Sequence, residues 1–169
     1  LQEEEARGGA HTNETVGYLA MPQLRSAMPA EHVATTHEVA NVRFAGSKPS
    51  DPVVLASIDT FNGRDTADVR LRNLHRGGAE LFVEEEASKD DELNHSEELI
   101  GYLRTGSGPL YDDEGARIGE AGVFATDQPG SGQWHAVDLD GSYANPVVFA
   151  QVMSYNGSNP CHVRLQNVS

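Results

Sequence analysis

The chain has 169 residues, enough for one ordinary domain or two small ones with a buried core. Its 26 acidic against 12 basic residues give a formal charge of −14, which argues against partners such as nucleic acid or anionic membrane surfaces. No apolar run approaches the ~20 residues of a membrane helix, so we expect no membrane insertion. The single cysteine excludes an intrachain disulfide.

Several short segments in chain order have the alternation and turn signals of β-strands. Gly77-Gly78 and Asn62-Gly63 are turn signals, and Asn-Gly predicts a type I′ hairpin between residues 53–58 and 69–72. The stretches 22–31 and 105–121 have the composition of connectors. The expected strands are residues 14–19, 39–44, 53–58, 69–72, 79–86, 98–103 and 134–139, with copies of the hairpin strands after residue 146.

Parts of the sequence occur twice. Residues 52–75 (PVVLASIDTFNGRDTADVRLRNLH) align without a gap with residues 146–169 (PVVFAQVMSYNGSNPCHVRLQNVS), and ten of the 24 positions are identical. EEEA occurs at residues 3–6 and 84–87, and HTNETVGYL at 11–19 matches HSEELIGYL at 95–103. A weaker match relates residues 36–39 to 134–137. These matches indicate a duplicated module.

The order of the copies predicts one whole and one split module. Residues 1–22 are the back half of a split module, 23–105 a complete module, and 106–169 a connector with the front half. The chain begins with Leu1 rather than Met, so we expect a processed protein or a piece of a longer one. Three interpretations stay open: a fragment of a tandem array, a permuted protein whose ends meet, or halves that complete each other between subunits.

Each module contains about five or six expected strands, with turn signals every 8–12 residues and no long helical periodicity. The predicted fold class is therefore all-β, with antiparallel β-sandwich modules.

An acidic segment with one histidine is the candidate metal site. A loop that carries Asp90 and Asp91 could close with neighbouring carboxylates over an oxygen-rich Ca²⁺ site. The alternative is a solvated charged face. A transition-metal pair of His95 and Glu98 is disfavoured, because residues three apart on a strand face opposite ways. The full candidate set is Glu84, Glu86, Asp90, Asp91, His95 and Glu98.

Arginines alternate with apolar residues on the expected strand 69–72. Arg70 and Arg72 would lie on its outer face, where the turn at Gly77-Gly78 places the acidic strand alongside. Cross-strand ion pairs are the favoured interpretation, and contact with a sugar or carboxylate ligand is the alternative.

Three aromatic residues are candidates for carbohydrate binding. Phe61 and Tyr155 precede the two Asn-Gly turns, at the rim of a sandwich where a ring could stack on a sugar or cover the turn. Trp134 is the third candidate, although its aligned residue is Thr36. Four glycosylation sequons, at Asn13, Asn94, Asn156 and Asn167, point to a secreted chain.

The segment NPVVFAQVMSYNGSNPCHVRLQNV, preceded by GQWHAVDLDGSYA, resembles a repeated module of large secreted and cell-surface proteins of marine bacteria and haloarchaea. With EEEA…H-x-x-E-x-I-G-Y-L from the other copy, it is more distantly similar to the H-type lectin domain. This resemblance implies a six-stranded antiparallel sandwich, an extracellular location and a tendency to oligomerise. H-type lectins bind galactose-type sugars between subunits, but no binding residue of this chain is assigned from the resemblance.

We expect a non-catalytic extracellular or cell-surface protein of tandem β-sandwich modules. It would act in adhesion or in self-assembly of a surface layer or filament, by strand exchange between split modules and with Ca²⁺ bridging the acidic clusters. The alternative is a lectin-like carbohydrate-binding module of a secreted protein or of a polysaccharide-active enzyme. A hydrolase would need a carboxylate pair in a cleft, and repetition of the acidic cluster argues against one unique active site.

Overall fold

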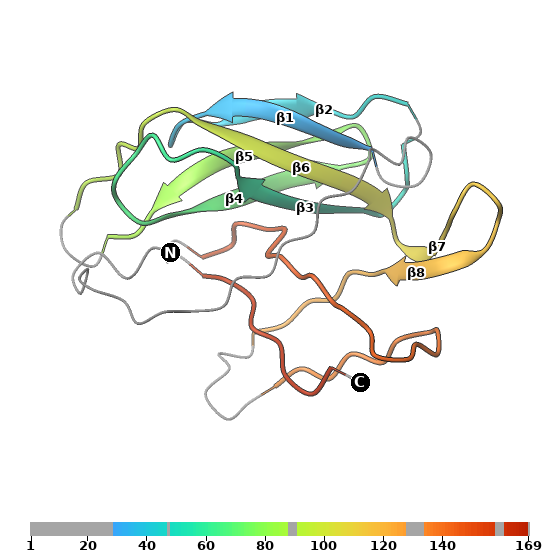
Figure 1. Cartoon of the computed structure of the whole chain (residues 1–169). Helices are drawn as coiled ribbons and strands as arrows, with labels where there is room; N and C mark the ends of the chain where they lie inside the picture. The colour runs from blue at the N-terminus through green and yellow to red at the C-terminus, as the bar shows by residue number, and fades with distance from the viewer. Residues whose placement is uncertain (1–28, 47, 88–90, 128–133, 158–160, 169) are drawn as a thin grey trace.

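The computed structural model describes residues 29–46, 48–87, 91–127, 134–157 and 161–168 (Figure 1). Within these ranges the chain forms strands, turns and loops but no helix. No described segment therefore provides a helix able to cross a membrane. The strands are β1 (Ala30–Thr35), β2 (Ala40–Arg43), β3 (Pro52–Ile58), β4 (Ala67–His75), β5 (Gly78–Glu85), β6 (Glu98–Gly106), β7 (Gly108–Tyr111) and β8 (Arg117–Ala121).

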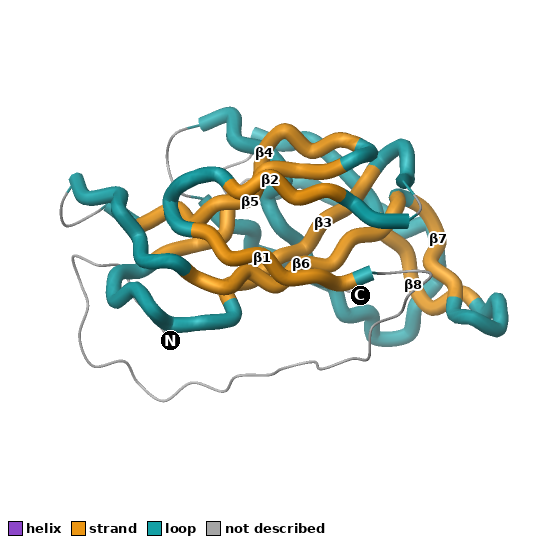
Figure 2. The backbone as a smooth tube through the Cα atoms, turned by 90° about the horizontal axis from the view of Figure 1, so that it is seen from above, coloured by secondary structure: helices purple, strands orange, loops and turns teal. Residues whose placement is uncertain are grey.

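Six of these strands form two antiparallel sheets that pack against each other. One sheet has the order β1-β6-β3 and the other the order β2-β5-β4. Figure 2 shows β2, β4 and β5 on one side of the molecule and β1 and β6 on the other. The core between them takes residues from both sheets: Val54, Ile100 and Tyr102 from the first, and Val42, Leu71, Leu81 and Val83 from the second. The predicted all-β antiparallel fold is confirmed.

Apolar alternation and a glycine position the β4–β5 pair within its sheet. Val69 and Leu71 pair with Val83 and Leu81 across the two strands, so apolar residues meet on the inner face. Gly78 lies so close to β2 that an added Cβ would come within 2.2 Å of the Val42 carbonyl oxygen. A larger residue at this position would separate β2 from β5.

The predicted hairpin around Asn62-Gly63 is wrong. β3 pairs with β6 in one sheet, whereas β4 pairs with β5 in the other. The intervening loop crosses between the sheets, and neither Asn62 nor Gly63 has the positive φ that a type I′ turn requires. The carboxylate of Glu98 binds the backbone of this loop instead, as described below.

The two expected connectors also differ from the prediction. Residues 105–121 contain the antiparallel hairpin of β7 and β8, and β1 begins inside the stretch 22–31. In contrast, the expected strands at 134–139 and after residue 146 form no strand within the described part of the C-terminal region. For the segment after residue 146, the alignment places pairing partners in residues 1–22. That stretch, with its expected strand at 14–19, lies outside the described residues.

Candidate functional site

The C-terminal residues lie along one open edge of the sandwich, beneath β3 and β4 in Figure 1. β3 is the edge strand of its sheet. Its Val54 amide donates to Sδ of Met153 at 3.2 Å, and its Ala56 amide donates to Oε1 of Gln151 at 2.6 Å. Side chains of the C-terminal segment thus satisfy amides that a further strand would otherwise use.

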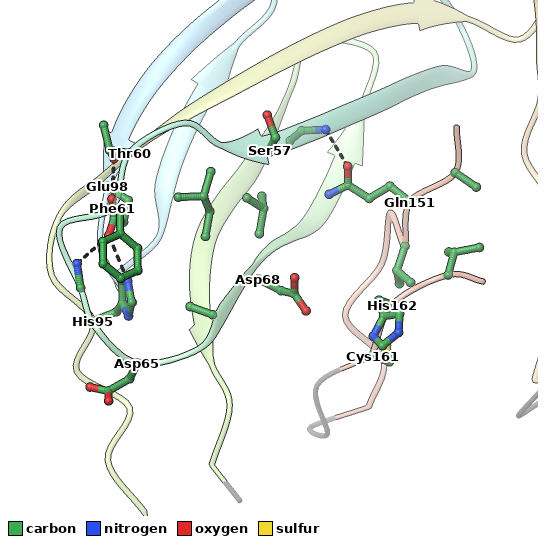
Figure 3. A pocket seen from close by; sticks show the side chains of 18 residues that line it. Ser57, Thr60, Phe61, Asp65, Asp68, His95, Glu98, Gln151, Cys161 and His162 are labelled. Carbon is green, nitrogen blue, oxygen red and sulfur yellow. Dashed lines mark hydrogen bonds and ion pairs between the residues drawn. The ribbon is translucent and has the colours of Figure 1, made fainter. Parts of the chain in front are cut away.

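A pocket of about 460 Å³ lies between this segment and the sandwich. Ser57 on β3 and Asp68 on β4 line one side, while Gln151 and His162 line the other (Figure 3). Phe61, 70% exposed, also lines the pocket. Polar groups and one exposed ring therefore face a shared space.

A buried carboxylate closes one end of the pocket. Glu98, the first residue of β6, is 2% exposed, and its Oε1 accepts hydrogen bonds from the amides of Asn62 and Gly63, both at 2.7 Å. The hydroxyl of Thr60 donates to its Oε2. Burial alone would raise the pKa of the Glu98 carboxyl, but the hydrogen bonds that it accepts outweigh burial and hold this pKa below its ordinary 4.5.

His95 extends this buried group to the second sheet. Its Nδ1 lies 2.8 Å from Oε1 of Glu85, and its Nε2 lies 3.3 Å from Oε1 of Glu98. The ring also occupies the space beside Gly63, where an added Cβ would come within 2.4 Å of the imidazole. The Glu85–His95–Glu98 network therefore joins β5, β6 and the loop between β3 and β4, which is a structural role.

Tyr155 of the C-terminal segment binds to the outer face of the β4–β5 pair. Its hydroxyl donates to Oε1 of Glu84 at 2.9 Å. Its ring lies edge-on to the ring of Phe82, with 5.3 Å between the two ring centres. The guanidinium of Arg70 lies 4.8 Å from the ring centre and also pairs with Glu84. The hydrogen bond to Glu84 and burial raise the pKa of the Tyr155 phenol.

Both arginines of β4 form cross-strand ion pairs, but only Arg70 pairs with the expected acidic segment 84–86. Arg70 pairs with Glu84, and Arg72 pairs with Glu80 at 2.6 Å. Arg70 is nevertheless buried rather than solvated, because Tyr155 covers it.

The three candidate carbohydrate-binding aromatics do not share one pocket. Phe61 lines the pocket described above, whereas Tyr155 lines a second one of about 450 Å³ with Arg72 and Met153. Trp134 is exposed and lines neither of these two pockets. Only Phe61 therefore combines exposure with polar neighbours in a cavity, and its role in sugar binding stays a prediction.

The candidate metal ligands do not come together at one site. Glu84 pairs with Arg70, and Glu98 binds the loop described above. Glu86 is half-buried just after β5, Asp91 is exposed, and Asp90 lies outside the described residues. No group of three or more potential ligands with suitable geometry occurs in the described part of the chain.

The expectation that His95 and Glu98 face opposite ways is wrong. β6 begins at Glu98, so His95 belongs to the preceding loop and can turn toward it. Strand alternation does not apply to a residue before the strand.

Sequence reasoning missed several residues that organise this region: Glu85, Gln151, Met153 and Glu120. Glu120 on β8 accepts hydrogen bonds from the amides of Asp140 and Gly141 at 2.8 Å each and from the hydroxyl of Tyr143 at 2.9 Å. Of these four, Glu85 had a sequence signal, because EEEA is repeated.

Of the sequons, Asn94, Asn156 and Asn167 are exposed, and Asn13 lies outside the described residues.

Aligned positions in the two copies differ sharply in burial. Val53 is 9% exposed, whereas its aligned residue Val147 is 79% exposed. Leu71 is fully buried, whereas Leu165 is 48% exposed. Val147 and Leu165 thus face solvent, although their aligned residues are buried in the sandwich.

These features define an all-β protein with an antiparallel sandwich, a buried acid–histidine network and an uncovered apolar segment. Comparison with protein-family models, curated proteins and solved structures finds no match to this chain.

Proposed function

We propose that the protein is a non-catalytic building block of an extracellular assembly, such as a surface layer, a filament or an adhesive structure. Copies join when residues 1–22 of one copy cover the C-terminal segment of the next. The observation that carries this proposal is the exposure of Val147 and Leu165, whose aligned residues Val53 and Leu71 belong to the buried interior of the complete module.

Residues 1–22 carry the side chains that such a cover needs. The repeats align Glu4 with Glu85, His11 with His95, and Glu14 with Glu98. On the other side, Asn156 and Gly157 stand where Asn62 and Gly63 bind the carboxylate in the complete module. Further aligned pairs are Ser154 with Thr60, Val16 with Ile100, and Tyr18 with Tyr102. The two end segments together thus hold counterparts of the network residues and of part of the core, although the core residue Val83 aligns with Gln2.

The driving force is burial of apolar surface. Each large apolar side chain that moves from solvent into a core contributes about 1.5–3 kcal/mol. Val147, Phe149 and Leu165 are all exposed enough to gain from it. Unpaired strands with apolar side chains also associate readily, because their amides and carbonyls need partners.

An extracellular location and a role for cations complete the proposal. Asn94, Asn156 and Asn167 are exposed members of sequons, as glycosylation would require. A charge of −14 on every copy opposes association, and Ca²⁺ between acidic surfaces would reduce that repulsion.

Light scattering across a concentration series tests the proposal. The wild-type chain should grow in mass with concentration, and chelation of Ca²⁺ should reduce that growth. Val16→Asp should abolish association, because it places a charge where the alignment predicts a core residue. Ile118→Asp on β8, at an exposed apolar position, is the matched control and should associate normally.

A synthetic peptide of residues 1–22 should compete with association between copies. A chain that stays monomeric at every concentration would contradict the proposal. So would a Val16→Asp variant that associates like wild type.

The pocket beside Phe61 favours glycan binding as a second candidate function. The exposed ring lines one end of this pocket, and Asp65, Asp68, Gln151 and His162 supply hydrogen-bonding groups elsewhere along its lining. A glycan array with wild type and Phe61→Ala tests this candidate. Binding that depends on Phe61 supports it, and a blank array at high protein concentration counts against it.

A further inference from the structure

The chain contains the dipeptide Asn-Gly twice, at Asn62-Gly63 and at Asn156-Gly157. Asparagine followed by glycine can lose its side-chain amide without an enzyme, because glycine has no Cβ to hinder attack by its own backbone nitrogen on the neighbouring side chain. The reaction requires that this nitrogen lose its proton and that the chain bring it to the side-chain carbonyl. The surroundings of the two glycine amides therefore decide which asparagine reacts.

At Asn62-Gly63 the fold blocks this reaction. The buried Gly63 amide donates to Oε1 of Glu98 at 2.7 Å, and a carboxylate beside an amide disfavours loss of the amide proton because it repels the resulting anion. The side-chain nitrogen of Asn62 donates to the backbone oxygen of Glu97 at 2.8 Å, which fixes the asparagine side chain. The ring of His95 fills the space beside Gly63. Both reacting groups are therefore held in place.

Asn156-Gly157 has none of these restraints within the described residues. Both residues are exposed, and an added Cβ on Gly157 would meet nothing within 4 Å beyond its chain neighbours. No hydrogen bond engages the Gly157 amide in the part of the chain that the structure describes. The preceding residue, Tyr155, is anchored to Glu84. The reactive dipeptide is thus presented to solvent next to an anchored residue.

We propose that Asn156 is a self-modification site that converts to aspartate and isoaspartate in the folded protein, whereas Asn62 is protected. The backbone nitrogen of Gly157 loses its proton and attacks the side-chain carbonyl carbon of Asn156, and the new C–N bond closes a succinimide ring. The bond from that carbon to Nδ2 breaks, and Nδ2 leaves as ammonia with the proton. Water then opens the ring at either carbonyl and gives aspartate or isoaspartate.

The conversion adds a negative charge and removes a glycosylation acceptor. Asn156 begins an Asn-Gly-Ser sequon, and a glycan would attach to the same Nδ2 that leaves as ammonia. Glycosylation and deamidation of Asn156 therefore exclude each other. The other exposed sequon residues, Asn94 and Asn167, precede His95 and Val168, whose side chains hinder the attack. These two asparagines should keep their amides longer.

Peptide mapping by mass spectrometry of the full, unglycosylated chain after incubation at mildly alkaline pH tests the site. Asn156 should convert first. Asn62 should convert roughly ten- to a hundred-fold more slowly, the factor by which one hydrogen bond to a charged acceptor restrains the Gly63 amide. The same incubation in guanidinium chloride should bring the two rates together, because both sites are then the same dipeptide in an unfolded chain.

A substitution at the attacking residue tests the chemistry. Gly157→Ala should slow conversion at Asn156, because the added methyl group hinders approach of the backbone nitrogen to the side chain. The open space around Gly157 should leave the unfolding free energy of this variant close to that of wild type. A lower conversion rate would then reflect the reaction itself rather than a change in the fold.

A substitution at the protecting carboxylate tests the other site. Glu98→Gln should speed conversion at Asn62, because it removes the charge that restrains the Gly63 amide. Glu97→Gln, at an exposed neighbouring position, is the matched control and should leave the rate at Asn62 unchanged. If Glu98→Gln does not fold, the comparison of native and denatured wild type still measures the protection.

Two outcomes would overturn the site. One is a folded chain that keeps the amide of Asn156 through the incubation, and the other is a folded chain that converts Asn62 as fast as Asn156. Neither readout depends on association between copies. Failure of this site and failure of the proposed function are therefore distinguishable.

Discussion

Residues 52–75 and 146–168 share a sequence pattern but not an environment. In the first region β3 and β4 each have a neighbouring strand, and Val53, Val54 and Leu71 are buried. In the second region the described residues form no strand, and Val147 and Leu165 are exposed. Since the local sequences are so similar, strand formation here depends on a pairing partner more than on intrinsic preference.

The largest expected difference lies at the paired leucines. Leu71→Ala removes a fully buried side chain and should lower the free energy of unfolding by about 2–5 kcal/mol. Leu165→Ala in the monomeric chain should change it by about 0.5 kcal/mol or less, because Leu165 is already exposed. Urea unfolding at low protein concentration measures both, and equal losses would break the comparison.

Substitution of Glu98 should lower the free energy of unfolding by an amount that is large and depends on pH. Glu98→Gln weakens hydrogen bonds to a buried carboxylate, which are worth about 1.5–3 kcal/mol each when the acceptor is charged. The pKa of Glu98 is lowered in the folded state, so its contribution is present above the ordinary 4.5 and is lost as the pH falls below that value.

The matched control is Glu97→Gln at an exposed neighbouring position. Wild type and Glu97→Gln should both lose stability below about pH 4.5, whereas Glu98→Gln should lose less over that range. Identical slopes of unfolding free energy against pH would show that Glu98 carries none of the effect.

The paired glycines should respond differently to alanine. Gly63→Ala places a methyl group within 2.4 Å of the His95 ring and should cost about 1–3 kcal/mol through overpacking. Gly157→Ala meets nothing within 4 Å, so its effect in the monomer should be small. Thermal unfolding of both variants provides the measurement, and a neutral Gly63→Ala would show that His95 can move away.

The smallest expected effect concerns Tyr155. Tyr155→Phe removes the hydroxyl that donates to Glu84 but keeps the ring on Arg70, and it should cost about 1 kcal/mol. Tyr111→Phe on β7, at an exposed tyrosine, is the control. If both variants unfold like wild type, the hydrogen bond from Tyr155 to Glu84 does not contribute to the stability of the folded chain.

Five strands of the sandwich could be predicted because their alternation and turn residues are local. The conformation of the loop at Asn62-Gly63 could not be predicted, because the carboxylate of Glu98, far along the chain, accepts hydrogen bonds from the loop amides. These hydrogen bonds override the local preference for a hairpin turn. β1 follows a proline-containing stretch without clear alternation, which hid it.

The candidate site shows the same division. Arg70 with Glu84 follows from a hairpin with a recognisable Gly-Gly turn. The contact between His95 and Glu98 depends on where β6 begins, and Tyr155 reaches Glu84 only through the long-range path of the C-terminal segment. Neither is encoded in local periodicity.

The side-chain caps on β3 have a consequence for unwanted fibre growth. Gln151 and Met153 accept hydrogen bonds from the amides of Ala56 and Val54. A strand of another molecule would need these same amides to pair with β3. A cap made by a side chain opens with a single rotamer change, whereas a paired strand must break its whole ladder. Resistance to amyloid-like stacking at this edge therefore depends on two side chains.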